Sequence, residues 1–183
     1  MQSHHTEGVL LIQDAGVATL RFNRPAEMNA LDVPAASAFR AACQQVARDT
    51  TVRAVVICGE GRAFGVGGDL AALQHNATAT AAALIDNLHE GIQLLAGISA
   101  PVIASLHGVV AGGSLSLSLA CDLAIAAEGT RFNLAYVNLA ASCDVSGSWS
   151  LPRLVGLRKA MEIALLSETF DAQEAVDLGR GEA

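Results

Sequence analysis

Residues 101–127 read PVIASLHGVVAGGSLSLSLACDLAIAA, and this stretch decides the fold class. Residues 101–106 form a short apolar run that predicts a buried strand, and a turn follows at His107-Gly108. Residues 112–120 predict a helix that begins at two adjacent glycines, and residues 122–127 predict another buried strand. Because strands and helices alternate, the stretch predicts an α/β fold with a largely parallel sheet.

The chain before this stretch follows the same alternation. Residues 8–13 and 16–22 predict a hairpin, and a loop follows them. A helix is expected from Pro34 to Arg48, since proline suits the first helical turn. Residues 53–58 predict a buried strand and residues 80–97 a second long helix. The chain after Ser146 is expected to be mainly helical.

The composition limits the classes of function. A length of 183 residues predicts one domain with a substantial core. A formal charge of -7 and an aromatic content of 4% argue against nucleic-acid binding, because phosphate binding needs clustered cations. The run between Glu90 and Asp122 has no Asp, Glu, Lys or Arg, but glycines, serines and a proline interrupt it. It lacks the roughly 18 strongly apolar residues that a membrane span needs, so no membrane partner is expected.

The N-terminus and the cysteines point to a cytoplasmic protein. Residues 1–7 are expected to be a flexible terminus and residues 8–183 a single domain, and the start does not look like a signal peptide. The cysteines are widely spaced with no C-x-x-C, which indicates buried free thiols and no metal site. They are Cys43, Cys58, Cys121 and Cys143.

Two glycine-rich loops are the main candidates for ligand binding. The first, GVGGDL at 65–70, has Leu70 where a dinucleotide loop would need a third glycine, and no P-loop lysine follows. The second, at Gly112-Gly113, has Ser116 where a nucleophile elbow would have glycine. Both loops follow strands and precede helices, so their backbone N–H groups could bind an oxyanion. From spacing alone, simple tight turns are the favoured explanation of the glycines.

VRAVVICGEGRAFGVGGDL followed by PVIASLHGVVAGGSLSLSLACDLAIA closely resembles the enoyl-CoA hydratase/isomerase (crotonase) superfamily. RPAEMNAL before these segments and FNLAYVNLAASCDVSGSWSLPRLVG after them continue the resemblance, which covers roughly residues 8 to 179. It implies a spiral of ββα units with a C-terminal helical part. It also implies an acyl-CoA thioester substrate, no cofactor beyond its coenzyme A, and a homotrimer or homohexamer.

The resemblance also assigns site residues. The oxyanion hole would be formed by the backbone amides of Gly68 and Gly113, with Gly67 allowing close backbone approach. Coenzyme A contacts would come from two segments, namely Met28 to Ala30 and the residues Gly68, Asp69, Leu70 and Ala71. Asp69 and Asp122 are expected to be mainly structural carboxylates.

The residue that moves a proton departs from the hydratase pattern. Where the resembling hydratases carry two glutamates, this chain has Ser116 and Tyr136, which cannot activate water as a carboxylate pair does. Tyr136 is expected to line the acyl pocket, and Ser116 either holds a water or packs within its helix. Asp144 remains, in a segment that resembles the P-D-G-G-G-S-W pattern of the isomerases. It is expected to carry a proton along the acyl chain, the alternative being a cap on the following helix.

Three other functions stay open. One is hydration by an atypical mechanism. The second is aryl-CoA dehalogenation, in which Asp144 would attack an aromatic carbon and His89 would assist. The third is a non-catalytic acyl-CoA-binding subunit. Members of the superfamily also continue past the AVDLG-like segment with further helices, so the sequence looks truncated at GRGEA.

Overall fold

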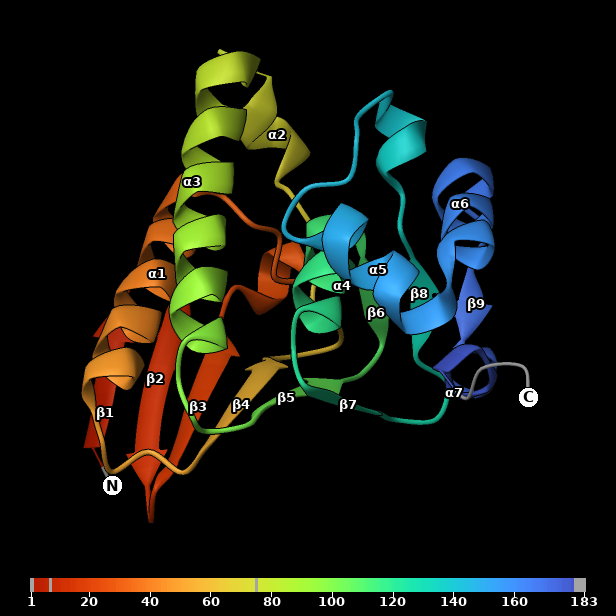
Figure 1. Cartoon of the computed structure of the whole chain (residues 1–183). Helices are drawn as coiled ribbons and strands as arrows, with labels where there is room; N and C mark the ends of the chain where they lie inside the picture. The colour runs from red at the N-terminus through yellow and green to blue at the C-terminus, as the bar shows by residue number, and fades with distance from the viewer. Residues whose placement is uncertain (1, 7, 75, 180–183) are drawn as a thin grey trace.

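The computed structural model describes residues 2–6, 8–74 and 76–179, of which residues 2–6 are described by their backbone alone. Its main sheet has the strand order β1-β2-β3-β4-β5-β7 (Figure 1). The first two pairs are antiparallel, and β3-β4, β4-β5 and β5-β7 are parallel. The strands are β1 (Gln2–Thr6), β2 (Val9–Asp14), β3 (Val17–Phe22), β4 (Ala54–Gly59), β5 (Val102–Leu106) and β7 (Leu123–Ala126).

A smaller sheet gives the chain its spiral course. It contains β6 (Val109–Ala111), β8 (Arg131–Asn133) and β9 (Phe170–Asp171), with β6 parallel to β8 and β8 antiparallel to β9. After β5 the chain turns into β6, and after β7 it turns into β8. Because β5 pairs with β7 and β6 with β8, each turn of the chain stacks on the preceding one in the same direction.

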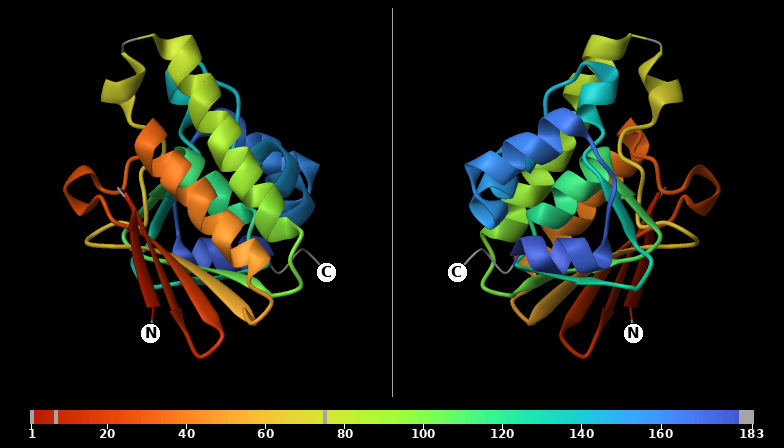
Figure 2. Two further views of the ribbon diagram at one scale, coloured as in Figure 1. Left: turned by 90° about the vertical axis from the view of Figure 1, so that its left-hand side faces the viewer. Right: turned by 90° about the vertical axis from the view of Figure 1, so that its right-hand side faces the viewer.

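Two long helices, α1 (Val33–Arg48) and α3 (Ala77–Ala96), lie side by side over one face of the main sheet (Figure 2). The Asp32 carboxylate caps α1 by accepting the N–H of Ala35 at 2.8 Å. Gly91 allows the two helices to approach, since a Cβ there would lie 2.6 Å from the ring of Phe39. Phe39 is fully buried and stacks on Phe22 of β3, so the helix pair and the sheet share one core.

The remaining helices lie around the site and at the C-terminal end. The short α2 (Leu70–Leu73) and α4 (Gly112–Leu119) each follow one of the glycine-rich loops. Two 3₁₀ turns, η1 (Pro25–Glu27) and η2 (Tyr136–Leu139), lie in connecting segments. Beyond η2 come α5 (Gly147–Val155), α6 (Leu157–Leu166) and α7 (Ala172–Gly179), and α5 contacts α4, α6 and α7.

Most of the predicted elements are present, and the α/β class is confirmed. The expected hairpin, both long helices, the glycine-initiated helix and the helical C-terminal part all form, although α3 begins at Ala77 rather than at residue 80. The buried strand expected at residues 122–127 is wrong in its burial. β7 is the last strand of the main sheet, and Leu123 and Ile125 are 58% and 67% exposed.

The first residues also differ from expectation. A flexible terminus was expected over residues 1–7, but Gln2–Thr6 form β1 and pair with β2 in register from Gln2 opposite Gln13 to Thr6 opposite Val9. β2 otherwise has an unpaired edge, and a strand added there satisfies its backbone groups. Met1 and Glu7 lie outside the described residues.

Across the described ranges, none of the helices combines the length and the apolar character needed to cross a bilayer.

Candidate active site

The two glycine-rich loops meet at the N-terminus of α4. A parallel bridge joins Gly65 to Val110 of β6, and a second bridge joins Leu31 to Gly68. The Gly67 N–H donates to Ser114 Oγ at 3.1 Å. The loop after β4 is therefore fixed between the segment before α1 and the first turn of α4.

Gly67 is required at the closest point of this contact. Its φ is +86°, and a Cβ there would lie 2.9 Å from the Gly113 nitrogen and 3.1 Å from the Ala111 oxygen. A side chain would both strain the backbone and push the loop off α4. Gly67 therefore makes a tight turn and also permits the close approach of its loop to the first turn of α4.

The backbone amides of Gly68 and Gly113 belong to the two loops that meet at α4. The bridge to Leu31 uses the Gly67 carbonyl and the Asp69 N–H, so the Gly68 N–H leaves the chain on the side away from Leu31. Gly113 lies in the first turn of α4, where N–H groups have no partner within the helix. The positive end of the helix dipole adds to the attraction for an anion. Two amides from adjacent loops thus form a candidate oxyanion hole.

The expected coenzyme A segments lie beside this hole. The Leu31–Gly68 bridge brings the stretch from Met28 to Ala30 next to the stretch that begins at Gly68. Ala30 is buried and Met28 is half-buried with a φ of +50°, whereas Leu70 and Ala71, in the first turn of α2, are exposed. The two segments are therefore close enough to contact one ligand.

Two carboxylates make structural contacts. Asp69 caps α2 by accepting the N–H groups of Ala71 and Ala72, and it forms an ion pair with Arg24 at 3.3 Å. Asp122 accepts the Val102 N–H at 2.8 Å and so joins β7 to β5.

Ser116, Tyr136 and Asp144 form one hydrogen-bonded cluster. The Tyr136 hydroxyl donates to Asp144 Oδ1 at 2.6 Å and lies 3.0 Å from Ser116 Oγ. Ser116 is fully buried, Tyr136 nearly so, and Asp144 is half-buried. The same hydroxyl lies 3.7 Å from where a Cβ on Gly113 would be. The cluster is therefore adjacent to one of the two oxyanion amides.

The cluster has a protonated phenol beside a carboxylate. Burial, together with the charge of Asp144, raises the pKa of Tyr136 far above its ordinary value of about 10. Tyr136 therefore stays neutral and acts as a hydrogen-bond donor. Burial and the same carboxylate also raise the pKa of the neighbouring thiol of Cys143.

Asp144 does not cap the following helix through its side chain. Ser146 occupies the N-cap of α5 and makes no side-chain cap hydrogen bond, while the Asp144 carboxylate accepts from Tyr136. The backbone next to Asp144 contacts His89 of α3, because the Val145 N–H donates to His89 Nε2 at 3.1 Å. His89, the residue that would assist in dehalogenation, therefore contacts Val145, the residue that directly follows Asp144.

Three side chains shape the site through contacts that the sequence did not indicate. Arg24 forms ion pairs with Asp32 and Asp69 and donates to the Ala30 carbonyl. The buried Asn29 side chain donates to the Ala63 carbonyl at 2.8 Å, which ties the stretch from Met28 to Ala30 to the start of the loop after β4. Ser114 fixes Gly67. The signal for Ser114 was its position directly after Gly113, while Arg24 acts through partners up to 45 residues away.

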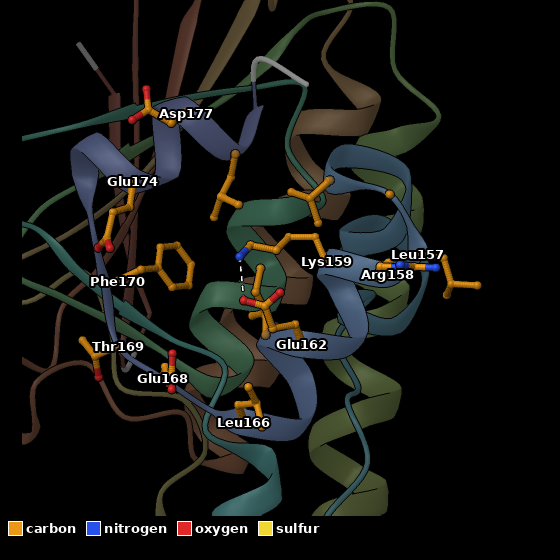
Figure 3. A pocket seen from close by; sticks show the side chains of 14 residues that line it. Leu157, Arg158, Lys159, Glu162, Leu166, Glu168, Thr169, Phe170, Glu174 and Asp177 are labelled. Atoms are coloured by element: carbon orange, nitrogen blue, oxygen red, sulfur yellow. Dashed lines mark hydrogen bonds and ion pairs between the residues drawn. The ribbon is translucent and has the colours of Figure 1, made fainter. Parts of the chain in front are cut away.

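A separate hollow of about 800 Å³ lies between α6 and the segment that carries β9 and α7 (Figure 3). Its lining includes Phe170, Glu174 and the ion pair of Lys159 with Glu162 at 2.6 Å. None of the candidate site residues lines it, so the hollow is distinct from the cluster described above.

A spiral of stacked strand turns, with two glycine-rich loops that meet at the first turn of α4, is the arrangement that the sequence resemblance implies. The chain belongs to the enoyl-CoA hydratase/isomerase family, whose profile matches residues 13–180.

Relatives of known name and structure support this membership. The chain is 34% identical over 183 residues to 4-chlorobenzoyl coenzyme A dehalogenase-2 of an Arthrobacter species, covering 98% of the chain and 66% of the relative. It is 32% identical over 175 residues to trans-2-decenoyl-[acyl-carrier-protein] isomerase of Streptococcus mutans, covering 93% and 66%. The chain thus spans about two-thirds of the length of these relatives.

A solved structure confirms the crotonase fold. It is a putative enoyl-CoA hydratase of Thermobifida fusca in complex with acetoacetyl-CoA. The two structures superpose with a TM-score of 0.85 at 30% sequence identity, over 96% of this chain and 72% of that one.

Proposed function

We propose that this chain forms the catalytic part of an acyl-CoA isomerase that moves a double bond by proton transfer through Asp144. The thioester oxygen would lie between the amides of Gly68 and Gly113. The Asp144 carboxylate removes a proton from the carbon next to the thioester and forms a dienolate. The resulting carboxylic acid, whose proton exchanges with solvent, then protonates the γ carbon, so a 3-enoyl thioester becomes a 2-enoyl thioester with no atom gained or lost overall.

The observation that carries this proposal is the placement of Asp144. Its Oδ1 is bound at 2.6 Å by a phenol that itself lies beside Gly113. A base in this position can reach a substrate whose thioester oxygen is held by the Gly113 amide. Positioned acid–base catalysis of this kind contributes typically about 10²–10⁴ in rate.

Hydration by two carboxylates has less support. The two positions at which hydratases of the superfamily carry glutamates hold Ser116 and Tyr136, and these side chains are hydrogen-bonded to each other at 3.0 Å. Neither can accept a proton from water near neutral pH, because the pKa of the buried phenol is raised and a serine hydroxyl is not a base. A single carboxylate suits proton transfer within one substrate better than the activation of water.

The test is incubation of the protein with a panel of 3-enoyl-CoA thioesters in D₂O. Isomerisation predicts 2-enoyl-CoA as product, with deuterium at the α or γ carbon. Asp144→Asn should lower the rate by about 10² or more. A 3-hydroxyacyl product would favour hydration instead, and a loss of less than tenfold in Asp144→Asn would remove the assigned role.

A second candidate function is aryl-CoA dehalogenation, favoured by the position of His89 next to Val145 and by the Arthrobacter relatives. In this reaction the Asp144 carboxylate attacks the halogen-bearing ring carbon and the halide leaves, and water then hydrolyses the aryl ester. Incubation with 4-chlorobenzoyl-CoA would release chloride and give a burst of covalent intermediate. The isomerase proposal predicts neither. Binding of acyl-CoA thioesters without turnover of any of them would instead indicate a binding subunit.

We further propose a cytoplasmic homotrimer or homohexamer that needs no cofactor beyond the coenzyme A of its substrate. The exposed apolar side chains of Leu123 and Ile125 on β7 support burial against another surface in the assembled protein. Light scattering on the purified full protein gives its mass directly. Dialysis against chelator should leave the activity unchanged.

A further inference from the structure

The backbone that follows Asp144 adopts a conformation that glycine ordinarily takes. Val145 has a φ of +48° and Ser146 a φ of +69°, and the Gly147 N–H donates to the Asp144 carbonyl at 2.8 Å. The four residues thus form a tight turn with positive φ at both central positions, which strongly favours Asn and Gly. A β-branched residue there is strained, because its Cβ is crowded by the backbone. Other contacts must hold this turn in place.

His89 makes one of these contacts from α3, 56 residues earlier in the chain. The Val145 N–H donates to His89 Nε2 at 3.1 Å. A backbone N–H is always a donor, so Nε2 is the unprotonated acceptor and the ring carries its proton on Nδ1. Because the peptide unit is planar, fixing this N–H fixes the plane that links Asp144 to Val145.

The Val145 side chain supplies a second contact. It is 2% exposed, and its Cγ2 lies 3.5 Å from the position of a Cβ on Gly113. The strained residue is thus held on its backbone by the imidazole and on its side chain by the first turn of α4. Both contacts hold Val145, which directly follows Asp144, and the Asp144 carboxylate accepts the hydrogen bond of Tyr136.

We propose that His89 is a positioning residue, which holds Val145 in the left-handed conformation and thereby keeps the Asp144 carboxylate against Tyr136 beside Gly113. The inference rests on the proposed function in one respect, that Asp144 carries the proton. In this role His89 accepts a hydrogen bond throughout turnover and neither gains nor loses a proton.

Two substitutions at position 89 separate positioning from acid–base catalysis. In His89→Gln the side-chain oxygen reaches about as far as Nε2 and still accepts the Val145 N–H, whereas His89→Leu removes the acceptor. Positioning predicts that kcat stays within about threefold in His89→Gln and falls about tenfold to a hundredfold in His89→Leu. Equal and large losses in both variants would overturn the proposal and assign the proton chemistry to His89.

Val145→Gly provides a rescue experiment. Glycine adopts positive φ without strain, so a turn with glycine at 145 depends less on the imidazole. In a double-mutant cycle, His89→Leu should therefore cost much less in kcat when residue 145 is glycine. The packing that glycine loses at position 145 affects both variants in that background equally, so it cancels from the comparison. The same loss in both backgrounds would contradict the proposal.

Amide hydrogen exchange gives a readout that does not depend on activity. In the intact chain, the peptide that contains Val145 should exchange faster in His89→Leu and near the wild-type rate in His89→Gln. Unchanged exchange in His89→Leu would refute the positioning role even where Asp144 is essential. If Asp144→Asn instead keeps full activity, the proposed function fails while the exchange result still decides the role of His89.

Discussion

Gly67→Ala tests whether the contact between the two glycine-rich loops forms the oxyanion hole. The native φ of +86° costs an alanine about 1–2 kcal/mol. The new Cβ would also lie 2.9 Å from the Gly113 nitrogen and 3.1 Å from the Ala111 oxygen, and overpacking of this kind costs about 1–3 kcal/mol. The sum predicts a loss of roughly 2–5 kcal/mol in the free energy of unfolding, unless the loop moves away from α4.

Either response displaces one of the two loop amides, so the rate should fall about 10²–10³ if these amides form the oxyanion hole. Urea unfolding measures the stability, and deuterium incorporation into 3-enoyl-CoA measures the rate. Calorimetric titration with acetoacetyl-CoA, whose enolate form needs the same two amides, should show weaker binding.

Gly129→Ala is the matched control. Its φ is +80°, and a Cβ there meets no atom within 4 Å, so it introduces the backbone strain without the close contact. It should lose only about 1–2 kcal/mol and keep wild-type rate and acetoacetyl-CoA binding. If Gly67→Ala matched this control in all three measurements, the two loops would not form the hole as described.

The remaining predictions concern the tyrosine–serine pair, a buried thiol and an ion pair. Tyr136→Phe leaves the buried Ser116 hydroxyl and the Asp144 carboxylate without their phenol partner and should lower the free energy of unfolding by about 1–3 kcal/mol. Adding Ser116→Ala should recover, in urea unfolding, the part of that loss that comes from the serine. Burial raises the pKa of Cys43, so its contribution to stability is complete below the unfolded thiol pKa of about 8.5 and declines as pH rises above it. The free energy of unfolding should therefore decrease between pH 7 and pH 10, and this decrease should be about 2 kcal/mol smaller in Cys43→Ala than in the wild type. An equal decrease in both proteins would contradict the raised pKa of Cys43. Arg24→Met removes half-buried ion pairs with Asp32 and Asp69, beside the segments proposed to contact coenzyme A, and should weaken acetoacetyl-CoA binding about tenfold. Arg21→Met, which removes an exposed pair with Glu60, should change calorimetric affinity by less than about twofold.

The sequence predicted the elements well where the signal was local. Apolar runs, Pro34 and paired glycines each act within a few residues, and they correctly located the hairpin, the long helices and α4. Burial of β7 could not be predicted in this way. An apolar run has the same sequence pattern whether its strand lies at the edge or in the centre of a sheet. The position is decided by whether another strand pairs with its free side, and that strand comes from elsewhere in the chain.

The candidate site was predictable only in part. Resemblance to a family pointed to Gly68, Gly113 and Asp144, and the structure gathers the two loops and the aspartate at one end of α4. The contact of His89 with Val145 spans 56 residues and depends on a backbone N–H, so no side-chain motif records it. Positive φ at Val145 was equally hidden, since valine gives no sequence signal for a left-handed turn.

The stacked turns of the spiral also bear on how the protein folds. Leu31, Gly68, Gly113 and Asp144 come from successive turns, so the candidate site is assembled only after each turn has docked on the one before. Such distant pairings form slowly and late in folding. A tight-binding thioester should therefore bind only the fully folded chain. A labelled thioester could report folding kinetics, because its binding signal would rise at the final docking step.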